Sequence, residues 1–245
     1  MSPSDFRTAA GTTVPAVTTG EMREVDRVAV ESVGLDLLQM MENAGRNLAA
    51  HCRQLREEGP VVILVGAGGN GGGGLACARH LSNRNVPVSV VLDRDPDELD
   101  GAASHQYRIL QADGVDVSLD PDQLESIGLI VDALIGYGLS DAPRSRPAEL
   151  IGWLSGVSAP ILSLDVPSGV DATTGEIPEV AVEPDRTLTL ALPKTGLRTI
   201  SGSLYLADIA IPEVVYRTLE IPYHNPFEDQ YWIELERPVE KARRL

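Results

Sequence analysis

The chain has 245 residues, 43% of them hydrophobic, and a formal net charge of −16 at pH 7. This length is enough for one large α/β domain or two small ones with a sizeable core, and the acidic balance excludes the basic surface that nucleic-acid binding requires. Because the chain has no apolar run of membrane-spanning length and no apolar leader at its start, we expect a cytoplasmic protein that does not bind membranes.

The amino-terminal part of the chain predicts an extension ahead of the main fold. Residues 1–19 are polar and rich in Thr, Pro and Ala, which is typical of a loose arm. A helix is expected to begin near Glu21, with Thr18 or Thr19 as its cap. A second helix is expected over residues 35–55.

From Val61 onward, short and nearly continuous apolar segments alternate with helical patterns. This alternation predicts a mostly parallel sheet that is buried on both faces. The expected fold class is therefore α/β: a three-layer α/β/α Rossmann-like sandwich with an N-terminal helical extension, formed by a single domain over residues 1–245. Strands are expected at 61–65, 86–92, 128–132, 160–164, 186–192 and 203–208, and helices at 72–83, 98–112, 121–126 and 147–155.

The C-terminal tail, residues 217–245, is unusually aromatic for this chain. Its aromatic residues are Tyr223, Phe227, Tyr231 and Trp232. Such a tail more often packs on its own domain than on a partner subunit, so we expect the first arrangement and leave the second open.

A loop rich in glycine follows the expected strand at 61–65. Seven of the nine residues from Gly66 to Gly74 are glycine. Such a loop is expected where backbone amides approach a ligand closely or where φ is positive, and between a strand and a helix the usual ligand is a phosphate or pyrophosphate. Gly66, Gly68 and Gly71 match the dinucleotide fingerprint, although any glycine run this dense would match it.

Three acidic residues follow expected strands, where open parallel sheets bind their ligands. Asp93 has the place of a ribose-binding acid, although its charged neighbours are equally typical of a solvated turn. Asp132 and Asp165 leave buried strands, which is costly unless a ligand, a cation or a backbone donor meets them; capping of loop amides is the structural alternative. Asn70, Asp132 and Ser168 would face one crevice with oxygen ligands only, which suits a hard cation rather than zinc or iron.

Seven motifs in collinear order, covering about residues 20 to 216, resemble the YjeF N-terminal domain family, the NAD(P)H-hydrate epimerases. They are Glu21-Met22 with Asp26, Met41 to Gly45, Gly66 to Leu81, Val131 to Gly136 with Gly138 to Ser140, Leu164 to Asp171, Thr187 to Thr189 with Leu192 to Leu197, and Asp208 to Pro212.

The resemblance implies an isomerase of nicotinamide nucleotide repair. Such enzymes interconvert the R and S forms of hydrated NADH and NADPH, called NADHX and NADPHX, and are usually homodimers. A dehydratase then restores NAD(P)H from the S form. Because no second domain is expected here, the resemblance implies that this functional partner is a separate protein.

The resemblance also assigns the site. It implies Asp165 as the catalytic acid and a potassium ion held by Asn70, Asp132 and Ser168. Lys194 is a candidate second participant, with anchoring of its loop as the alternative. The implied substrate-binding residues are Gly69, Asn70, Gly71, Gly72, Gly73, Gly136, Tyr137, Gly138, Leu139, Ser140, Asp141, Ala142 and Asp165.

The chain departs from the family pattern within this site. Ala67, Gly69 and Gly73 replace a proline, an asparagine and an aspartate, and Tyr137 stands where a small residue or threonine is common. Two alternatives therefore remain open. The glycine substitutions favour a non-catalytic nucleotide-binding or scaffolding relative, whereas the dinucleotide fingerprint and Asp93 support an NAD-dependent oxidoreductase.

Overall fold

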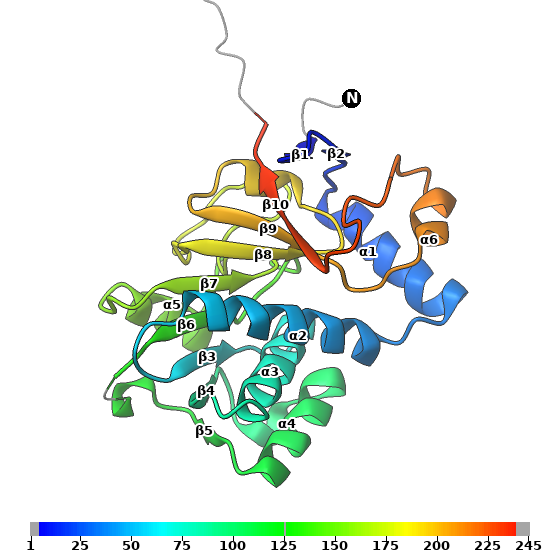
Figure 1. The fold of residues 1–245 in the computed structure, drawn as a ribbon. Helices are drawn as coiled ribbons and strands as arrows, with labels where there is room; N and C mark the ends of the chain where they lie inside the picture. Colours follow the sequence, from blue (N-terminus) through cyan, green and yellow to red (C-terminus); the bar gives the residue numbers. More distant parts are fainter. Residues whose placement is uncertain (1–4, 125, 239–245) are drawn as a thin grey trace, which may run out of the picture.

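The computed structural model describes residues 5–124 and 126–238, and its central feature is a ten-stranded sheet (Figure 1). Seven adjacent strands, from β9 to β5 in the order below, are parallel, and the three at the other edge are joined by antiparallel pairing. The spatial order is β2 (Thr13–Val14), β1 (Phe6–Thr8), β10 (Trp232–Glu236), β9 (Ser203–Ala207), β8 (Arg186–Leu190), β7 (Ile161–Leu164), β6 (Leu129–Ala133), β3 (Val61–Val65), β4 (Val88–Leu92) and β5 (Asp116–Ser118).

Helices cover both faces of the sheet, which gives the three-layer α/β/α arrangement that the sequence predicts. The helices are α1 (Thr19–Arg27), which continues into a π-helical turn (Val28–Val33), α2 (Leu37–Leu55), α3 (Gly69–Ser82), α4 (Gly101–Asp113), α5 (Ser145–Leu154) and α6 (Glu213–Thr218). Among the described residues, no helix is long and apolar enough to cross a membrane.

The buried strands alternate between two cores, because successive side chains of a strand point to opposite faces. In β3, Val61, Ile63 and Val65 belong to the core beneath α2 and α3, whereas Val62 and Leu64 belong to the core beneath α5. All six strands predicted between residues 61 and 208 are present, with ends that differ by at most two residues.

The prediction of a helix over residues 121–126 is wrong. Only a single 3-10 turn, Pro121–Gln123, forms there. Asp120 caps its start, and the turn ends because the backbone is already extended at Leu124. Residue 125 lies outside the described residues.

The prediction of a loose arm over residues 1–19 is also wrong for the described part. Phe6 and Val14 are buried, and β1 pairs with both β2 and β10 at one edge of the sheet. The expected helix cap is confirmed: Thr18 forms a capping box with Glu21 at the start of α1. The amino-terminal segment is therefore tied to the sheet and to α1.

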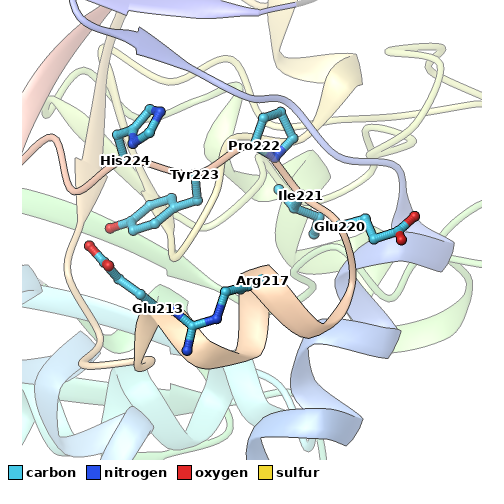
Figure 2. A pocket seen from close by; sticks show the side chains of 7 residues that line it. All are labelled: Glu213, Arg217, Glu220, Ile221, Pro222, Tyr223 and His224. Atoms are coloured by element: carbon cyan, nitrogen blue, oxygen red, sulfur yellow. The ribbon is translucent and has the colours of Figure 1, made fainter.

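The aromatic tail packs largely on its own chain, as expected. The rings of Tyr216 and Tyr223 lie 4.2 Å apart, Phe227 is buried, and Trp232 begins β10, whereas Tyr231 is exposed. The segment after α6 borders a surface groove of about 390 Å³ (Figure 2). None of the seven residues that line this groove is a predicted site residue.

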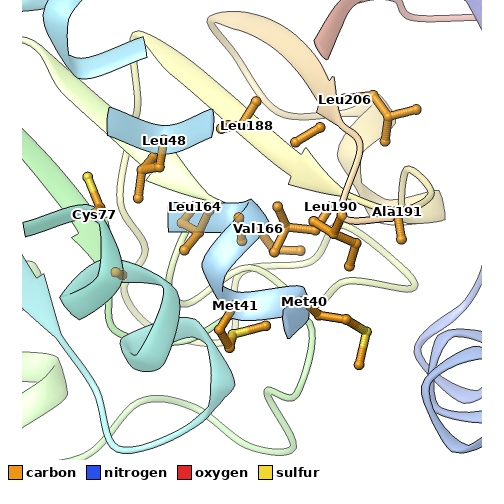
Figure 3. Close-up of a cluster of buried hydrophobic side chains, with 14 of the residues drawn as sticks. Met40, Met41, Leu48, Cys77, Leu164, Val166, Leu188, Leu190, Ala191 and Leu206 are labelled. Carbon is orange, nitrogen blue, oxygen red and sulfur yellow. The ribbon is translucent and has the colours of Figure 1, made fainter. Parts of the chain in front are cut away.

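One core cluster lies directly behind the strand ends that carry the polar site. Met40 and Met41 at the start of α2 lie with Leu164, Val166 and Leu190 (Figure 3). All five are buried. The polar residues that follow β7 and β8 thus lie next to a buried apolar cluster.

Candidate functional site

Asp165 is the first residue after β7, and its carboxylate is buried and held by several donors. Lys194 Nζ donates to its Oδ1 at 2.5 Å, the Leu190 amide donates to the same oxygen at 3.2 Å, and the Tyr137 amide donates to Oδ2 at 3.1 Å. Asp165 has a φ of +67°. A non-glycine residue in this left-handed region stores strain, and such strain is frequent at functional sites.

Lys194 brings the second charge to this site. It is 1% exposed, and its Nζ also donates to the Leu190 carbonyl at 2.9 Å. Val17 fixes the backbone beside it, because the Val17 amide donates to the Pro193 carbonyl at 3.0 Å. From the sequence alone Lys194 is only a candidate, whereas the fold pairs it directly with Asp165.

Asp132, in β6, is fully buried and makes four hydrogen bonds. Its Oδ1 accepts from the Ser168 hydroxyl at 2.5 Å and the Leu134 amide at 3.3 Å, and its Oδ2 accepts from the Ser163 hydroxyl at 2.8 Å and the Ser168 amide at 2.9 Å. Burial nevertheless raises the pKa of Asp132. The alternative of a carboxylate that caps loop amides therefore describes part of its role.

Asn70 and Gly136 lie close to Asp165. A Cβ added to Gly136 would be 3.1 Å from Asp165 Oδ2 and 3.2 Å from Asn70 Oδ1. Gly136 thus keeps open the space between these two side chains. Asn70 Nδ2 is buried without a hydrogen-bond partner among the described residues, which is unusual for a buried amide.

The segment from Gly136 to Ala142 contacts this site through its first two residues. Tyr137 contacts Asp165 through its amide, and its phenol donates a short hydrogen bond to Asp26 of α1. Gly138, Ser140 and Asp141 are exposed. Sequence reasoning missed Asp26 as a site residue. Its spacing of four from the buried Met22 was the available signal, because it puts a carboxyl group near the buried face of α1.

The loop in the glycine segment is shorter than the sequence predicts. Helix α3 begins at Gly69, with Gly68 as its cap, three residues before the predicted start at residue 72. No residue from 66 to 74 has a positive φ, so of the two reasons given for such a glycine run only close approach of the backbone applies. Close packing explains several of these glycines, because a Cβ at Gly66 would lie 2.0 Å from the Leu134 carbonyl oxygen and one at Gly74, within α3, would lie 2.7 Å from Ala133 Cβ at the end of β6. The start of α3 is pressed against the ends of the strands.

Two helical glycines provide a matched test of this packing. A Cβ at Gly71 would lie 1.7 Å from the Gly66 carbonyl oxygen, whereas one at Gly69 meets only Met41 Sδ at 3.9 Å. We expect Gly71→Ala to lower the free energy of unfolding by at least about 2 kcal/mol through overpacking. Gly69→Ala should raise it by about 0.4–1 kcal/mol by restricting the unfolded chain. Urea unfolding of both variants measures the difference, and equal effects would contradict the packing explanation.

Asp93 follows β4, as predicted, but its carboxylate already has a partner. Arg94 donates to both of its oxygens, at 2.8 and 3.1 Å. This arrangement does not favour the ribose-binding role on which the oxidoreductase alternative depends.

Comparison with known proteins identifies relatives over most of the chain. The family model for the YjeF-related protein N-terminus matches residues 37–196. The NAD(P)H-hydrate epimerase of Dehalogenimonas lykanthroporepellens is 44% identical over 237 residues, which cover 94% of this chain and 96% of that protein. The epimerase of Rhodopirellula baltica is 33% identical, with 85% of this chain and 89% of that protein covered.

The chain is also similar to part of a longer repair enzyme and to a solved structure. A bifunctional NAD(P)H-hydrate repair enzyme of Salinibacter ruber is 40% identical over 82% of this chain but only 42% of its own length. A crystal structure of a yeast protein has a TM-score of 0.79 and 26% identity, and the match covers 90% of this chain and all of that one.

Proposed function

Because this chain belongs to the YjeF-related N-terminal family, we propose that it is an NAD(P)H-hydrate epimerase, an isomerase of nicotinamide nucleotide repair. Its substrates are then NADHX and NADPHX, whose R and S forms it interconverts. The relatives named NAD(P)H-hydrate epimerase support this activity over nearly their full lengths.

The observation that best supports the proposal is the buried Asp165–Lys194 pair beside Gly136. Epimerisation at the hydroxylated ring carbon requires a proton for the departing hydroxyl group, so that it leaves as water. An acid–base pair held in an apolar surrounding is suited to this transfer. A carboxylate at the same place also stabilises the positive charge that develops on the ring.

The reaction balances without any other reactant. The ring nitrogen supplies the electron pair as the carbon–oxygen bond breaks, which gives a water molecule and a ring iminium. Water then adds to the other face of the same carbon and returns the proton to the pair. In this proposal Asp165 faces the developing cation, and Lys194 carries the proton that is exchanged.

Potassium is the cofactor we propose, held by Asn70, Asp132 and Ser168. The donor set fits, because all three side chains offer oxygen and hard cations prefer oxygen ligands. The unpartnered amide of Asn70 supports the assignment, since exchanging its oxygen and nitrogen positions would turn an oxygen toward the space that Nδ2 now faces. A bound ion would supply a fixed positive charge beside the substrate site.

Potassium binding should be visible as thermal stability. At ion concentrations tenfold to a hundredfold above Kd, a ligand that binds only the folded state adds about 1.4–2.7 kcal/mol. We therefore expect a higher Tm in potassium chloride than in tetramethylammonium chloride of the same ionic strength. Asn70→Ala should lose this difference, whereas the exposed Ser140→Ala should keep it. A Tm that is equal in the two salts would contradict the assignment.

The partners remain proposals of the same kind. We propose a homodimer and a separate dehydratase that consumes the S form. The bifunctional relatives support the functional link, because their name joins the repair activities in one protein. A cytoplasmic location is also proposed, since NAD(P)H is used there.

A stereochemical assay tests the function directly. Purified R-hydrate of NADH is incubated with the protein, and chromatography follows the appearance of the S form. We expect equilibration much faster than in buffer alone, and the same rate for Asp93→Asn, which changes a strand-end acid outside the site. Equilibration no faster than in buffer would contradict the proposal, and hydride transfer to a carbonyl compound would favour the oxidoreductase instead.

A further inference from the structure

Asp26 lies on α1, far in sequence from the Asp165–Lys194 pair, yet it reaches the same site. Its Oδ2 accepts the short hydrogen bond from the Tyr137 phenol, across a separation of 111 residues. Both side chains are half-buried. Neither the proposed chemistry nor the proposed ion site uses this carboxyl group.

Tyr137 connects α1 to the reacting pair. Its amide donates to Asp165 Oδ2 at 3.1 Å, and Lys194 Nζ lies 5.5 Å from the centroid of its ring. An ammonium within about 6 Å of an aromatic ring is attracted to it. One residue therefore contacts both charges of the pair, through its backbone and through its ring.

Helix α1 fixes Tyr137 at two points. Besides the bond from the phenol to Asp26, the Thr19 hydroxyl donates to the Tyr137 carbonyl at 3.4 Å. The Thr19 hydroxyl itself accepts from Thr173 at 3.1 Å, so this contact is part of a larger set of hydrogen bonds. Of the two, only the contact with Asp26 is made by the hydroxyl group of the ring.

From these contacts we propose that Asp26 is a positioning residue that acts through Tyr137. By accepting the phenolic hydrogen bond it holds the ring against Lys194 and keeps the start of the Gly136–Ala142 segment on Asp165. The inference rests on the proposed function, because it assigns the pair and this segment to the reaction. Asp26 itself is not required to touch substrate.

The surrounding charges are consistent with this role. Burial raises the pKa of Asp26, the bond from Tyr137 and the charge of Lys194 oppose that rise, and the charge of Asp165 adds to it. Burial and the charge of Asp26 raise the pKa of Tyr137, so the proton stays on the phenol. The tyrosine is thus the donor and the aspartate the acceptor. An amide oxygen at position 26 could accept the same bond.

The matched variants follow from this donor and acceptor assignment. Tyr137→Phe keeps the ring and removes the donor, Asp26→Ala removes the acceptor, and Asp26→Asn keeps an acceptor oxygen. For the first two we expect a KM for the hydrate roughly tenfold higher, with a smaller change in kcat. Asp26→Asn should stay within about threefold of wild type. The double variant Asp26→Ala/Tyr137→Phe should have a KM no higher than that of either single variant, because both changes remove the same hydrogen bond.

A second measurement is independent of activity. The sequence contains only two lysines, Lys194 and Lys241, so labelling lysine with 13C at Cε gives two signals, which Lys241→Arg assigns. We expect a ring-current shift at Lys194 in the wild type and in Asp26→Asn. The shift should fall to a common smaller value in Asp26→Ala and Tyr137→Phe.

These outcomes separate the inference from the proposed function. A protein without epimerase activity whose Lys194 signal follows this pattern would overturn the function and support the positioning role. An Asp26→Ala variant with the wild-type Lys194 signal and the wild-type KM would overturn the role, as would additive losses in the double variant. A lower apparent kcat at unchanged KM, with Asp26→Asn equally affected, would indicate loss of folded protein and would also overturn it.

Discussion

Replacing Lys194 by methionine is expected to lower the free energy of unfolding by about 3–5 kcal/mol, because the change leaves a buried carboxylate without its cation. Asp165 and Lys194 are 3% and 1% exposed, and Lys194 Nζ and Asp165 Oδ1 are 2.5 Å apart. Methionine has a similar length and no charge, so the effect measures the loss of charge rather than of packing. Urea unfolding at pH 7 provides the measurement.

The double variant Lys194→Met/Asp165→Asn is the control for this effect. It removes both charges, so most of the lost stability should return, since a buried ion pair adds little to stability over neutral groups. Epimerase activity should be lost in both variants, because neither keeps the pair. A single variant as stable as wild type would contradict the assignment of a buried ion pair.

Acidification should destabilise the protein through His51. This residue is fully buried in α2, where its ring lies 5.0 Å from that of Tyr205 and 5.1 Å from that of Trp232. Burial and the nearby charge of Arg186 lower the pKa of His51 to about 3. Arg186 contacts its Nδ1 at 3.1 Å, which requires a neutral ring with that nitrogen as the acceptor.

The sign and size of the effect follow from this difference in pKa. Between about 3 and the unfolded pKa of about 6.5, the unfolded chain binds a proton that the folded chain does not. The stability from neutral His51 is therefore complete above pH 6.5 and is lost as the pH falls. The loss is about 1.4 kcal/mol per pH unit, or about 2 kcal/mol between pH 6.5 and pH 5.

Two glutamine variants test this explanation. His51→Gln removes the group that titrates, so its free energy of unfolding should change less between pH 6.5 and pH 5 than that of the wild type. His105→Gln changes an exposed histidine and should keep the wild-type dependence. If His51→Gln showed the same slope as wild type, the buried histidine would not be its source.

The parallel part of the sheet was predictable because its strands are short apolar runs separated by helical patterns. Because β6 and β7 are neighbouring parallel strands, Asp132 and Asp165 lie at the same carboxyl end of the sheet. Their place at strand ends is visible in the sequence. In contrast, β1 and β2 have only three and two residues, which is too short for an alternating pattern to be recognised in the sequence. They form because β10, more than 200 positions away, pairs with β1, and a local pattern carries no signal for such a contact.

The site was predictable in its residues but less so in its geometry. The acid near the end of β6 and the acid after β7 are visible in the sequence, whereas the pairing of Asp165 with Lys194 depends on a turn 29 residues later. The sequence of the glycine segment predicts a ligand-binding loop. Glycine is needed at Gly66, which lies against the Leu134 carbonyl, and at Gly71, where α3 passes over the Gly66 carbonyl. The contact with Leu134 is determined by tertiary packing.

The most direct test of the proposed function is a coupled assay of Asp165. The R-hydrate of NADH is supplied together with an S-specific dehydratase, and the recovery of NADH is followed by its absorbance. We predict that the protein accelerates recovery and that Asp165→Ala reduces the acceleration by at least about 100-fold, the loss expected when a principal catalytic group is removed. No acceleration by the wild type, or equal acceleration by Asp165→Ala, would contradict the account.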